Sequence, residues 1–203
     1  FETYNDVSEE NSQAVDYAFS KGALVFMAAG NEADTATHYS GTVTANSTTD
    51  FIKVTIENTS QASLYFYLNW FDGKGTTNNL DLSLYDADKT DLSSNVSQFP
   101  EIESPRGTEA ELVYFNNYIS GPATFFLKVK NNSNSEQFYH IYSYDDNTTF
   151  ENADPGYTVV SPATADNAIA VASYVTRPSW TDYTGRPWEY SINKTVGSIS
   201  SFS

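Results

Sequence analysis

The chain has 203 residues, of which 26 are acidic and 10 are basic, so its formal net charge at pH 7 is −16. This acidity argues against nucleic acid or an anionic membrane surface as the partner. Hydrophobic residues make up 39% of the chain and aromatic residues 15%, so we expect a globular core rather than a disordered chain. Because the chain has no cysteine, disulfides, thiolate metal sites and a cysteine nucleophile are excluded.

Other sequence features limit which classes of protein this chain can belong to. The two histidines, His38 and His140, are isolated in the sequence and leave little material for a zinc site. No apolar run approaches the roughly 20 residues that span a bilayer, so we expect no membrane-spanning segment. The first residues, Phe1 to Tyr4, lack a starting Met and any signal pattern. We therefore expect a piece of a longer protein.

The first part of the chain, residues 1–37, predicts a helix followed by a strand. Ser8 is a candidate N-cap, Gly22 ends the helix, and apolar residues recur between them at helical spacing: Ala14, Val15, Ala18 and Phe19. The run from Ala23 to Ala29 is apolar at consecutive positions, which is typical of a strand buried on both faces of a parallel sheet. A helix that leads directly into such a strand indicates an α/β unit.

The middle part, residues 38–157, has a different pattern. Short runs of alternating apolar and polar residues, rich in aromatic and β-branched side chains, are separated by Asn, Ser, Gly and Asp clusters. We predict strands at 51–56, 63–68, 80–85, 110–114, 124–129 and 138–142. Such a series favours an antiparallel β-sandwich of the jelly-roll kind.

The last part, residues 158–203, returns to the first pattern, with a small-residue apolar strand at 167–173 followed by a loop from Pro178 to Gly197. The predicted fold is therefore mainly β: an antiparallel sandwich at 38–157 inserted into a partial α/β fold that contributes a helix and two parallel strands. For the host to tolerate such an insertion, its two ends must lie close together.

Three segments of the flanks carry a family resemblance. Residues 14–18 and 21–27 lead into Ala28-Ala29-Gly30-Asn31-Glu32; residues 158–163 precede Asn167-Ala-Ile-Ala-Val-Ala172; and residues 196–203 read Val-Gly-Ser-Ile-Ser-Ser-Phe-Ser. In this order they resemble segments of the subtilisin-like serine proteases, the subtilase family (peptidase family S8). The resemblance implies that this chain is a fragment of a secreted serine-type endopeptidase, whose partner is a peptide or protein substrate.

The resemblance assigns roles to five consecutive residues. Asn31 corresponds to the family's oxyanion asparagine, whose side-chain amide stabilises the negative charge that develops on the scissile carbonyl oxygen. Ala28, Ala29 and Gly30 would line one wall of the substrate pocket, and Glu32 would lie near its rim. Two other interpretations stay open: a Gly-Asn turn without catalytic function, and a Glu32 carboxylate that is merely solvent-exposed.

The chain also departs from the family. The segments that carry the catalytic aspartate, histidine and serine, Asp-Thr/Ser-Gly, His-Gly-Thr and Gly-Thr-Ser-Met-Ala, do not occur. His38 precedes Tyr39 and His140 precedes Ile141, so we predict that both histidines are surface or strand residues. Without a nucleophile and a general base we expect the isolated chain to have no peptidase activity. No cofactor is required for this chemistry.

The predicted sandwich resembles the prepeptidase C-terminal (PPC-like) and P-domain modules of secreted proteases, through Leu68-Asn69-Trp70, Asn78 to Asp86 and Ser120 to Val129. Such an insert would govern substrate access or partner binding. The alternative is a non-enzymatic, carbohydrate- or protein-binding module of a pseudo-protease. Its aromatic residues would either form a glycan- or peptide-binding face or pack inward: Tyr65, Tyr67, Trp70, Tyr114, Tyr139, Tyr142 and Tyr144.

Two further patterns bear on ligands and location. Acidic turns offer hard oxygen ligands for calcium, although solvated acidic turns are the commoner explanation of such residues: Asp72, Asn79, Asp81, Asp86, Asp88 and Asp91. Asn-x-Ser/Thr sequences suggest a surface that could carry glycans, and hence an extracellular or cell-surface protein: Asn46, Asn58, Asn95, Asn131, Asn147 and Asn193.

Overall fold

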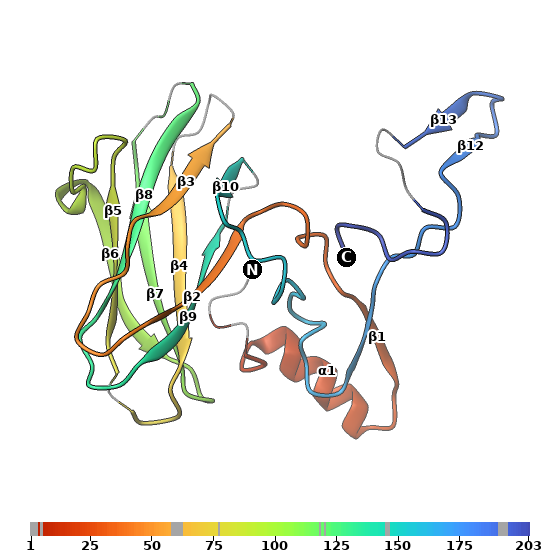
Figure 1. The fold of residues 1–203 in the computed structure, drawn as a ribbon. Coiled ribbons are helices and arrows are strands. Elements are labelled where there is room, and N and C mark those ends of the chain that lie inside the picture. Colours follow the sequence, from red (N-terminus) through yellow and green to blue (C-terminus); the bar gives the residue numbers. More distant parts are fainter. Residues whose placement is uncertain are drawn as a thin grey trace.

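The computed structural model describes residues 4, 6–57, 63–76, 78–117, 119, 121–144, 147–190 and 195–203. Two of the glycan-acceptor sequences, at Asn58 and Asn193, lie outside the described residues. The fold is mainly β, as predicted, with a two-sheet sandwich on one side of the molecule and a small α/β unit on the other (Figure 1). Within the described residues, no helix has the length and apolar character needed to cross a bilayer.

The sandwich consists of two antiparallel sheets. One has the strand order β2-β9-β4-β7-β6, and the other β10-β3-β8-β5. The bounds in the first sheet are β2 (His38–Val43), β9 (Gln137–Ser143), β4 (Leu64–Phe71), β7 (Thr108–Phe115) and β6 (Val96–Glu103). Those in the second are β10 (Thr148–Phe150), β3 (Ile52–Ile56), β8 (Ala123–Asn131) and β5 (Leu80–Tyr85); the short 3-10 helix η1 (Ser93–Asn95) lies between β5 and β6.

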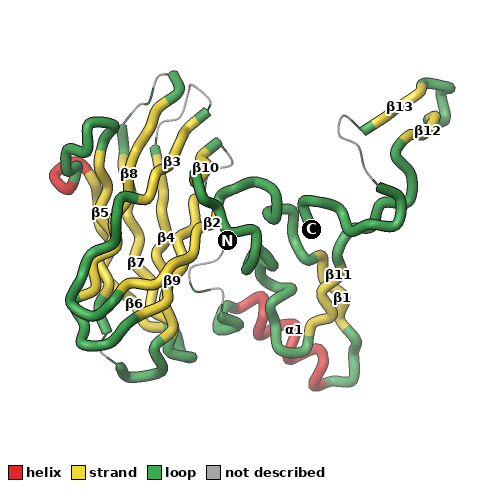
Figure 2. The backbone as a smooth tube through the Cα atoms, in the orientation of Figure 1, coloured by secondary structure: helices red, strands yellow, loops and turns green. Residues whose placement is uncertain are grey.

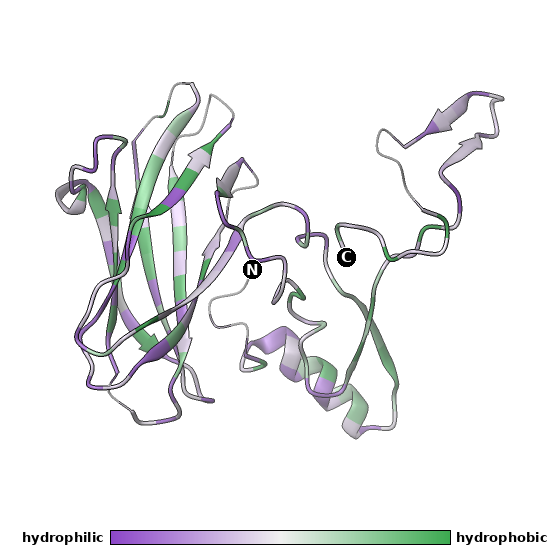
Figure 3. Cartoon of the chain, viewed as in Figure 1, coloured by the Kyte–Doolittle hydropathy of each residue, from purple (hydrophilic) through white to green (hydrophobic). Residues whose placement is uncertain are grey.

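Alternation of side chains produces the core between the two sheets. Successive residues of a strand point to opposite faces, and along β3 and β5 every second residue is buried. Figure 3 shows the resulting change between hydrophobic and hydrophilic residues along the sandwich strands. The largest fully buried side chains belong to this core and include Phe66, Leu68, Trp70, Leu127 and Tyr139.

All six strands predicted in the insert are present, with ends that differ by up to three residues. The sequence pattern missed β2, β6 and β10. β10 has only three residues, which is too short to show alternation. β6 lies at the edge of its sheet, contains Pro100, and shifts register against β7 between Phe99 and Ile102. Proline is tolerated in edge strands and at such irregularities, because its missing N–H breaks no ladder there.

The α/β unit contains α1 (Glu10–Ser20) and two parallel strands, β1 (Val25–Ala28) and β11 (Ala168–Val171). Figure 2 shows these strands side by side next to the helix. The predicted cap is wrong by one residue: Glu9 occupies the N-cap, and its side chain makes no capping hydrogen bond. The expectation that the strand is buried on both faces is also wrong, since Phe26 is 64% exposed and Val171 49%.

The loop predicted between Pro178 and Gly197 contains a hairpin of β12 (Ser179–Thr181) and β13 (Pro187–Glu189). Figure 1 shows it lying away from the other strands. Asp182 stabilises the turn by accepting hydrogen bonds from the Trp188 indole N–H, the Thr184 hydroxyl and backbone N–H groups. These donors, the Trp188 indole first, lower the pKa of Asp182 to about 2. Strands of three residues left no periodic signal to predict.

The two ends of the insertion are joined by hydrogen bonds. The Phe150 N–H donates to the Ala36 carbonyl at 2.9 Å, and the Asp154 N–H donates to the His38 carbonyl at 2.9 Å. The expected proximity of the ends is therefore confirmed. The exact domain bounds, 1–37, 38–157 and 158–203, stay a prediction.

Candidate functional site

The turn that follows β1 is fixed by hydrogen bonds to three separate segments. The Ala29 N–H donates to the Val171 carbonyl at the end of β11, and the Val160 N–H donates to the Ala29 carbonyl. Two residues beyond Asn31, the Ala33 N–H donates to the Phe202 carbonyl. The residues predicted from the subtilase resemblance thus stand where the carboxyl ends of two parallel strands meet, a usual place for ligand sites in α/β proteins.

The side-chain amide of Asn31 is exposed, and within the described residues no hydrogen bond occupies it. Its backbone N–H donates to Oε2 of Glu32 at 2.6 Å. Beside it lies an open hollow of about 450 Å³ whose wall includes Ala28, Gly30 and Asn31 from the first strand and Ala172 and Ser173 from the second. An unoccupied amide next to such a hollow is able to donate to a bound oxygen atom.

The structure thus brings three of the five predicted residues, Ala28, Gly30 and Asn31, to the hollow. Ala29 is buried and does not line the hollow. Glu32 does not line the hollow, and its carboxylate instead accepts the Asn31 N–H. The catalytic and substrate-binding roles of these residues stay predictions.

Residues that the sequence did not single out also line the hollow. Ser173 and Ser203 are among them, and the Ser173 N–H donates to Oγ of Ser203 at 3.0 Å. The Ser173 hydroxyl also lies 2.9 Å from that of Ser200. The only sequence signal for Ser173 was its position at the end of the predicted 167–173 strand.

Gly30 has a backbone φ of +125°, which side chains rarely adopt, and a Cβ there would collide with Oε2 of Glu32 and approach Val160 and Thr158. We expect Gly30→Ala to lower the free energy of unfolding by about 1–3 kcal/mol. Gly22→Ala is the matched control, since Gly22 also has a positive φ, +90°, but no atom within 4 Å of the added Cβ. Urea unfolding gives the free energy of unfolding of both variants, and the difference between their losses is the cost of crowding at Gly30. Equal losses in the two variants would contradict this account.

A second feature is a pair of histidines on the outer face of the larger sheet. Nε2 of His38 lies 3.0 Å from Nδ1 of His140, and Nδ1 of His38 lies 2.9 Å from the Asp154 carbonyl oxygen. The two histidines are 102 positions apart in the sequence, so their contact could not be seen there. As predicted, both are strand residues, in β2 and β9, but they form a connected pair rather than two independent side chains.

The hydrogen bonds determine the tautomers of this pair. A carbonyl oxygen only accepts, so Nδ1–H of His38 must donate to Asp154. Nε2 of neutral His38 is then an acceptor, and Nδ1–H of His140 must donate to it. Burial lowers the pKa of His38, and burial together with the neighbouring His38 lowers the pKa of His140 to about 4, while Asp154 acts in the opposite direction. Both rings are therefore neutral at pH 7.

Because the folded pKa of His140 lies below its ordinary value of 6.5, the unfolded chain binds more protons as pH falls from 6.5 to 4. The stability that the neutral pair provides is complete above about pH 6.5 and is lost toward pH 4. His140→Gln cannot gain this proton. We therefore expect the variant to lose on the order of 2 kcal/mol less unfolding free energy than the unchanged chain between pH 6.5 and 4. Thermal melts of the unchanged chain and of His140→Gln between pH 7 and 4 measure this difference. If the two proteins have the same pH profile, His140 is not the group responsible.

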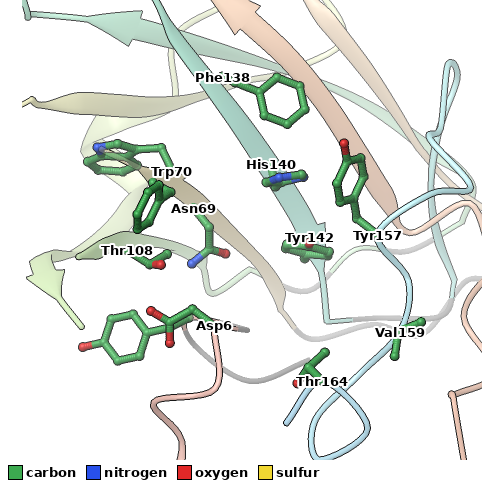
Figure 4. A pocket seen from close by; sticks show the side chains of 12 residues that line it. Asp6, Asn69, Trp70, Thr108, Phe138, His140, Tyr142, Tyr157, Val159 and Thr164 are labelled. Atoms are coloured by element: carbon green, nitrogen blue, oxygen red, sulfur yellow. The ribbon is translucent and has the colours of Figure 1, made fainter. Parts of the chain in front are cut away.

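A cavity of about 600 Å³ lies where this sheet face meets the flanking segments. Figure 4 shows Phe138, His140 and Tyr142 along β9, with Tyr157 facing them. The ring of His140 is 4.7 Å from that of Tyr157, and Asn69 and Asp6 add polar groups to the wall. The volume and the mixture of aromatic and polar groups fit a small-molecule or side-chain ligand.

The aromatic residues of the insert divide between the two faces. Trp70 and Tyr139 pack into the core, as one reading of the sequence expected. Tyr65 and Tyr114 lie on the outer face instead, with their rings stacked at 4.5 Å, and Tyr142 lines the cavity. The inward-packing interpretation therefore holds for Trp70 and Tyr139, and a glycan- or peptide-binding face formed by the outer aromatic residues stays a prediction.

Some carboxylates of the acidic turns accept hydrogen bonds from backbone N–H groups of the same turns. The carboxylate of Asp86 accepts the N–H groups of Asp88 and Thr90, and that of Asp91 accepts the N–H of Ser93. These are local turn contacts. Among the described residues, no three acidic or histidine side chains already stand together around one point in an arrangement for a metal ion. Calcium binding is thus left as a prediction.

One glycan-acceptor sequence is not usable in the folded chain. Asn131 is fully buried, and its amide donates to the carbonyls of Val43 and Ser135. Asn46, Asn95 and Asn147 are exposed. An extracellular location stays a prediction.

No protein-family model and no curated protein matches the sequence. Among solved structures, the chain is similar to the CspB protease of Clostridium perfringens, with a TM-score of 0.64 and 16% sequence identity over 86% of this chain. The chain spans 40% of the length of that protease. At this identity the likeness is one of fold: the described fold occurs within a protease.

Proposed function

We propose that this chain is the part of a secreted, subtilisin-like serine endopeptidase that carries the oxyanion-hole asparagine, Asn31. In the whole enzyme a serine and a histidine from other segments perform nucleophilic attack and proton transfer. The Asn31 amide stabilises the tetrahedral oxyanion, and the hollow beside Ala28 and Gly30 receives the substrate side chain. The substrate is a peptide or protein.

The observation that carries this proposal is the unoccupied amide of Asn31 at the joined ends of two parallel strands, next to the 450 Å³ hollow. An oxyanion donor must be held in place before the charge develops, because reorganisation during the reaction would lose the benefit. The hydrogen bonds from Ala29 to Val171 and from Ala33 to Phe202 hold the turn on both sides of Asn31. The likeness of the overall fold to part of the CspB protease is compatible with this proposal.

The inserted sandwich would control access to this site or contact a partner. Its first strand begins at His38, one short loop after Asn31. The insert also contacts the host through Arg106, which pairs with Asp166 at 2.7 Å, and through the hydroxyl of Ser104, which donates to the carboxylate of Asp6. These contacts hold the sandwich against the unit that carries Asn31.

The test compares the whole protein with the isolated chain. We expect the whole protein to hydrolyse casein and to be inactivated by a serine-directed fluorophosphonate, whereas residues 1–203 alone should show neither activity nor labelling. Casein hydrolysis by the isolated chain that persists through repurification would contradict the absence of a nucleophile here. A whole protein without fluorophosphonate-sensitive hydrolysis would contradict the proposed function.

The second candidate is a non-enzymatic module of a pseudo-protease that binds carbohydrate or protein. The cavity of about 600 Å³ favours it, since Tyr142 and Tyr157 offer ring faces and Asp6 and Asn69 offer hydrogen-bonding groups. Titration with oligosaccharides and short peptides, followed by tryptophan fluorescence, tests it. Tyr157→Ala should abolish binding and Tyr183→Ala, at a fully exposed site outside the cavity, should retain it; equal behaviour of the two variants would exclude the cavity.

A further inference from the structure

The hairpin of β12 and β13 carries a cluster of aromatic side chains at the surface. Trp180 pairs directly with Trp188 across the two strands, so both side chains project from the same face of the hairpin. Their rings are stacked with centroids 6.4 Å apart, and the ring of Tyr190 lies 5.5 Å from that of Trp180. Trp188 is 42% exposed and Tyr190 is 48% exposed. The three rings thus pack on one another while a large part of this aromatic face meets water.

Hydrogen bonds hold the hairpin in one shape. The Trp188 indole N–H donates to Oδ2 of Asp182 at 2.9 Å, and the Tyr190 N–H donates to the Pro178 carbonyl at 3.0 Å. The guanidinium of Arg186 lies 4.3 Å from the ring centroid of Trp188. A surface that is ordered before its partner arrives loses little conformational entropy on binding. Trp, Tyr and Arg are also the residue types that contribute most to recognition between proteins.

The base of the hairpin adjoins the hollow beside Asn31. The Ser200 N–H donates to the Ser173 carbonyl at 2.9 Å, which joins the two arms of the segment below the hairpin. A second hollow of about 240 Å³ lies here, and its wall includes Ser173, Arg177, Trp180 and Tyr190. Ser173 also lines the hollow beside Asn31. The two hollows share this wall residue, so one extended ligand is able to occupy both.

The arrangement of the rings favours a polypeptide over a glycan as that ligand. A sugar ring stacks on a free aromatic face, but the guanidinium of Arg186 covers the ring of Trp188, and the ring of Trp180 stacks on Trp188 and contacts Tyr190. Neither Arg177 nor Arg186 belongs to the ion pairs found in the described part of the chain. Both guanidinium groups are therefore available to acidic side chains of a polypeptide.

We propose that the aromatic face of Trp180, Trp188 and Tyr190 binds the polypeptide substrate of the proposed endopeptidase outside the hollow beside Asn31. Arg177 pairs with an acidic side chain of that substrate. This inference rests on the proposed function, because the chain that enters the first hollow is the one that continues onto the hairpin. An extended chain advances about 3.3 Å per residue, so only a substrate with several residues beyond the scissile bond reaches both hollows.

Binding of reduced, carboxymethylated α-lactalbumin, an unfolded polypeptide, to the immobilised 203-residue chain tests this inference. Trp180→Ala and Tyr190→Ala should each raise Kd by about ten-fold or more, as expected for aromatic side chains at the centre of a contact. Tyr17→Ala is the matched control and should leave Kd unchanged, because Tyr17 is 66% exposed on α1 and lines neither hollow.

A second measurement separates lost contacts from an unfolded hairpin. Stacked tryptophans give an exciton signal in circular dichroism, and its retention in Tyr190→Ala shows that this hairpin is folded. If both aromatic variants lose the signal, Arg177→Ala gives the reading, since it leaves the rings in place and should raise Kd by about three-fold or more. In the endopeptidase proposed above, Tyr190→Ala should raise KM for the same polypeptide by about five-fold or more with kcat retained, because the contact is made equally in the ground state and the transition state.

Three results would overturn the inference: equal polypeptide affinity in the unchanged chain and all variants, an equal loss of affinity in Tyr17→Ala, or displacement of the bound polypeptide by chitohexaose, which would make the face a glycan site. The proposed function fails separately. If the whole protein does not hydrolyse the polypeptide while its binding still depends on Tyr190, the binding face stands and only the peptidase assignment is wrong.

Discussion

In the endopeptidase proposed above, replacing Asn31 by alanine should lower kcat by about 10²–10³-fold and leave KM within about two-fold. The physical reason is that the amide meets a full negative charge only in the tetrahedral transition state, so its loss affects the chemical step and leaves ground-state binding nearly unchanged. In the folded chain this amide is exposed beside the hollow and has no competing partner among the described residues. The variant removes a donor without removing a structural contact.

Steady-state kinetics on a peptide ester and the inhibition constant of a peptide aldehyde measure this effect. The aldehyde forms a tetrahedral adduct at the serine, so its affinity should fall together with kcat. Asn95→Ala is the matched control, since Asn95 is exposed in the short helix η1 and does not line the hollow, so the variant should leave both quantities unchanged. An unchanged kcat in Asn31→Ala, or a loss confined to KM, would remove Asn31 from the mechanism.

The strands that the sequence predicted well are those whose side chains alternate over five or more residues. β3 and β5 bury every second residue, so their hydrophobic period is visible without any knowledge of partners. β2 was missed because its residues, His-Tyr-Ser-Gly-Thr-Val, are mixed in polarity, and its burial follows no alternation. Its place in the sheet comes from pairing with β9, a contact between distant parts of the chain that the local sequence does not show.

The candidate sites show the same limit. The residues at Ala28 to Glu32 could be selected in advance because they form one continuous segment that carries the family resemblance, but which of them line the hollow depends on the folded backbone: Ala28 does and the buried Ala29 does not. The histidine pair was not predictable, because the contact depends on register: Ser40 pairs with His140, and His38 pairs with Tyr142. Slipping the pairing by one residue would move one histidine to the opposite face of the sheet.

Glu111→Gln should raise thermal stability at pH 8 and leave it almost unchanged at pH 4.5. Glu111 is a buried residue of β7 that pairs with Leu68 of the core strand β4, and its Oε2 accepts the Leu82 N–H from the other sheet at 3.0 Å. Burial raises the pKa of Glu111 from 4.5 to about 8, with smaller contributions from Asp81 and Glu101, although the Leu82 N–H acts to lower it.

The sign follows from proton binding. Between pH 4.5 and 8 the folded chain holds a proton on Glu111 that the unfolded chain has released, so rising pH favours unfolding across this range. Glutamine keeps the shape and an oxygen acceptor for Leu82 but has no proton to lose. At pH 8 the gain should be on the order of 3 kcal/mol, which is about 6–12 °C in Tm for a chain of this size.

Melts of both proteins in EDTA at pH 4.5, 6 and 8 measure this gain without interference from bound cations. Glu136→Gln, at an exposed position, should show no pH-dependent change. An equal shift at all three pH values would mean that glutamine improves packing and that the charge is irrelevant. A loss of stability at pH 8 would mean that the ionised Glu111 carboxylate is stabilising, for example through the hydrogen bond from the Leu82 N–H. The direction of the shift at pH 8 therefore shows whether the ionised Glu111 carboxylate has a net electrostatic cost in the folded chain.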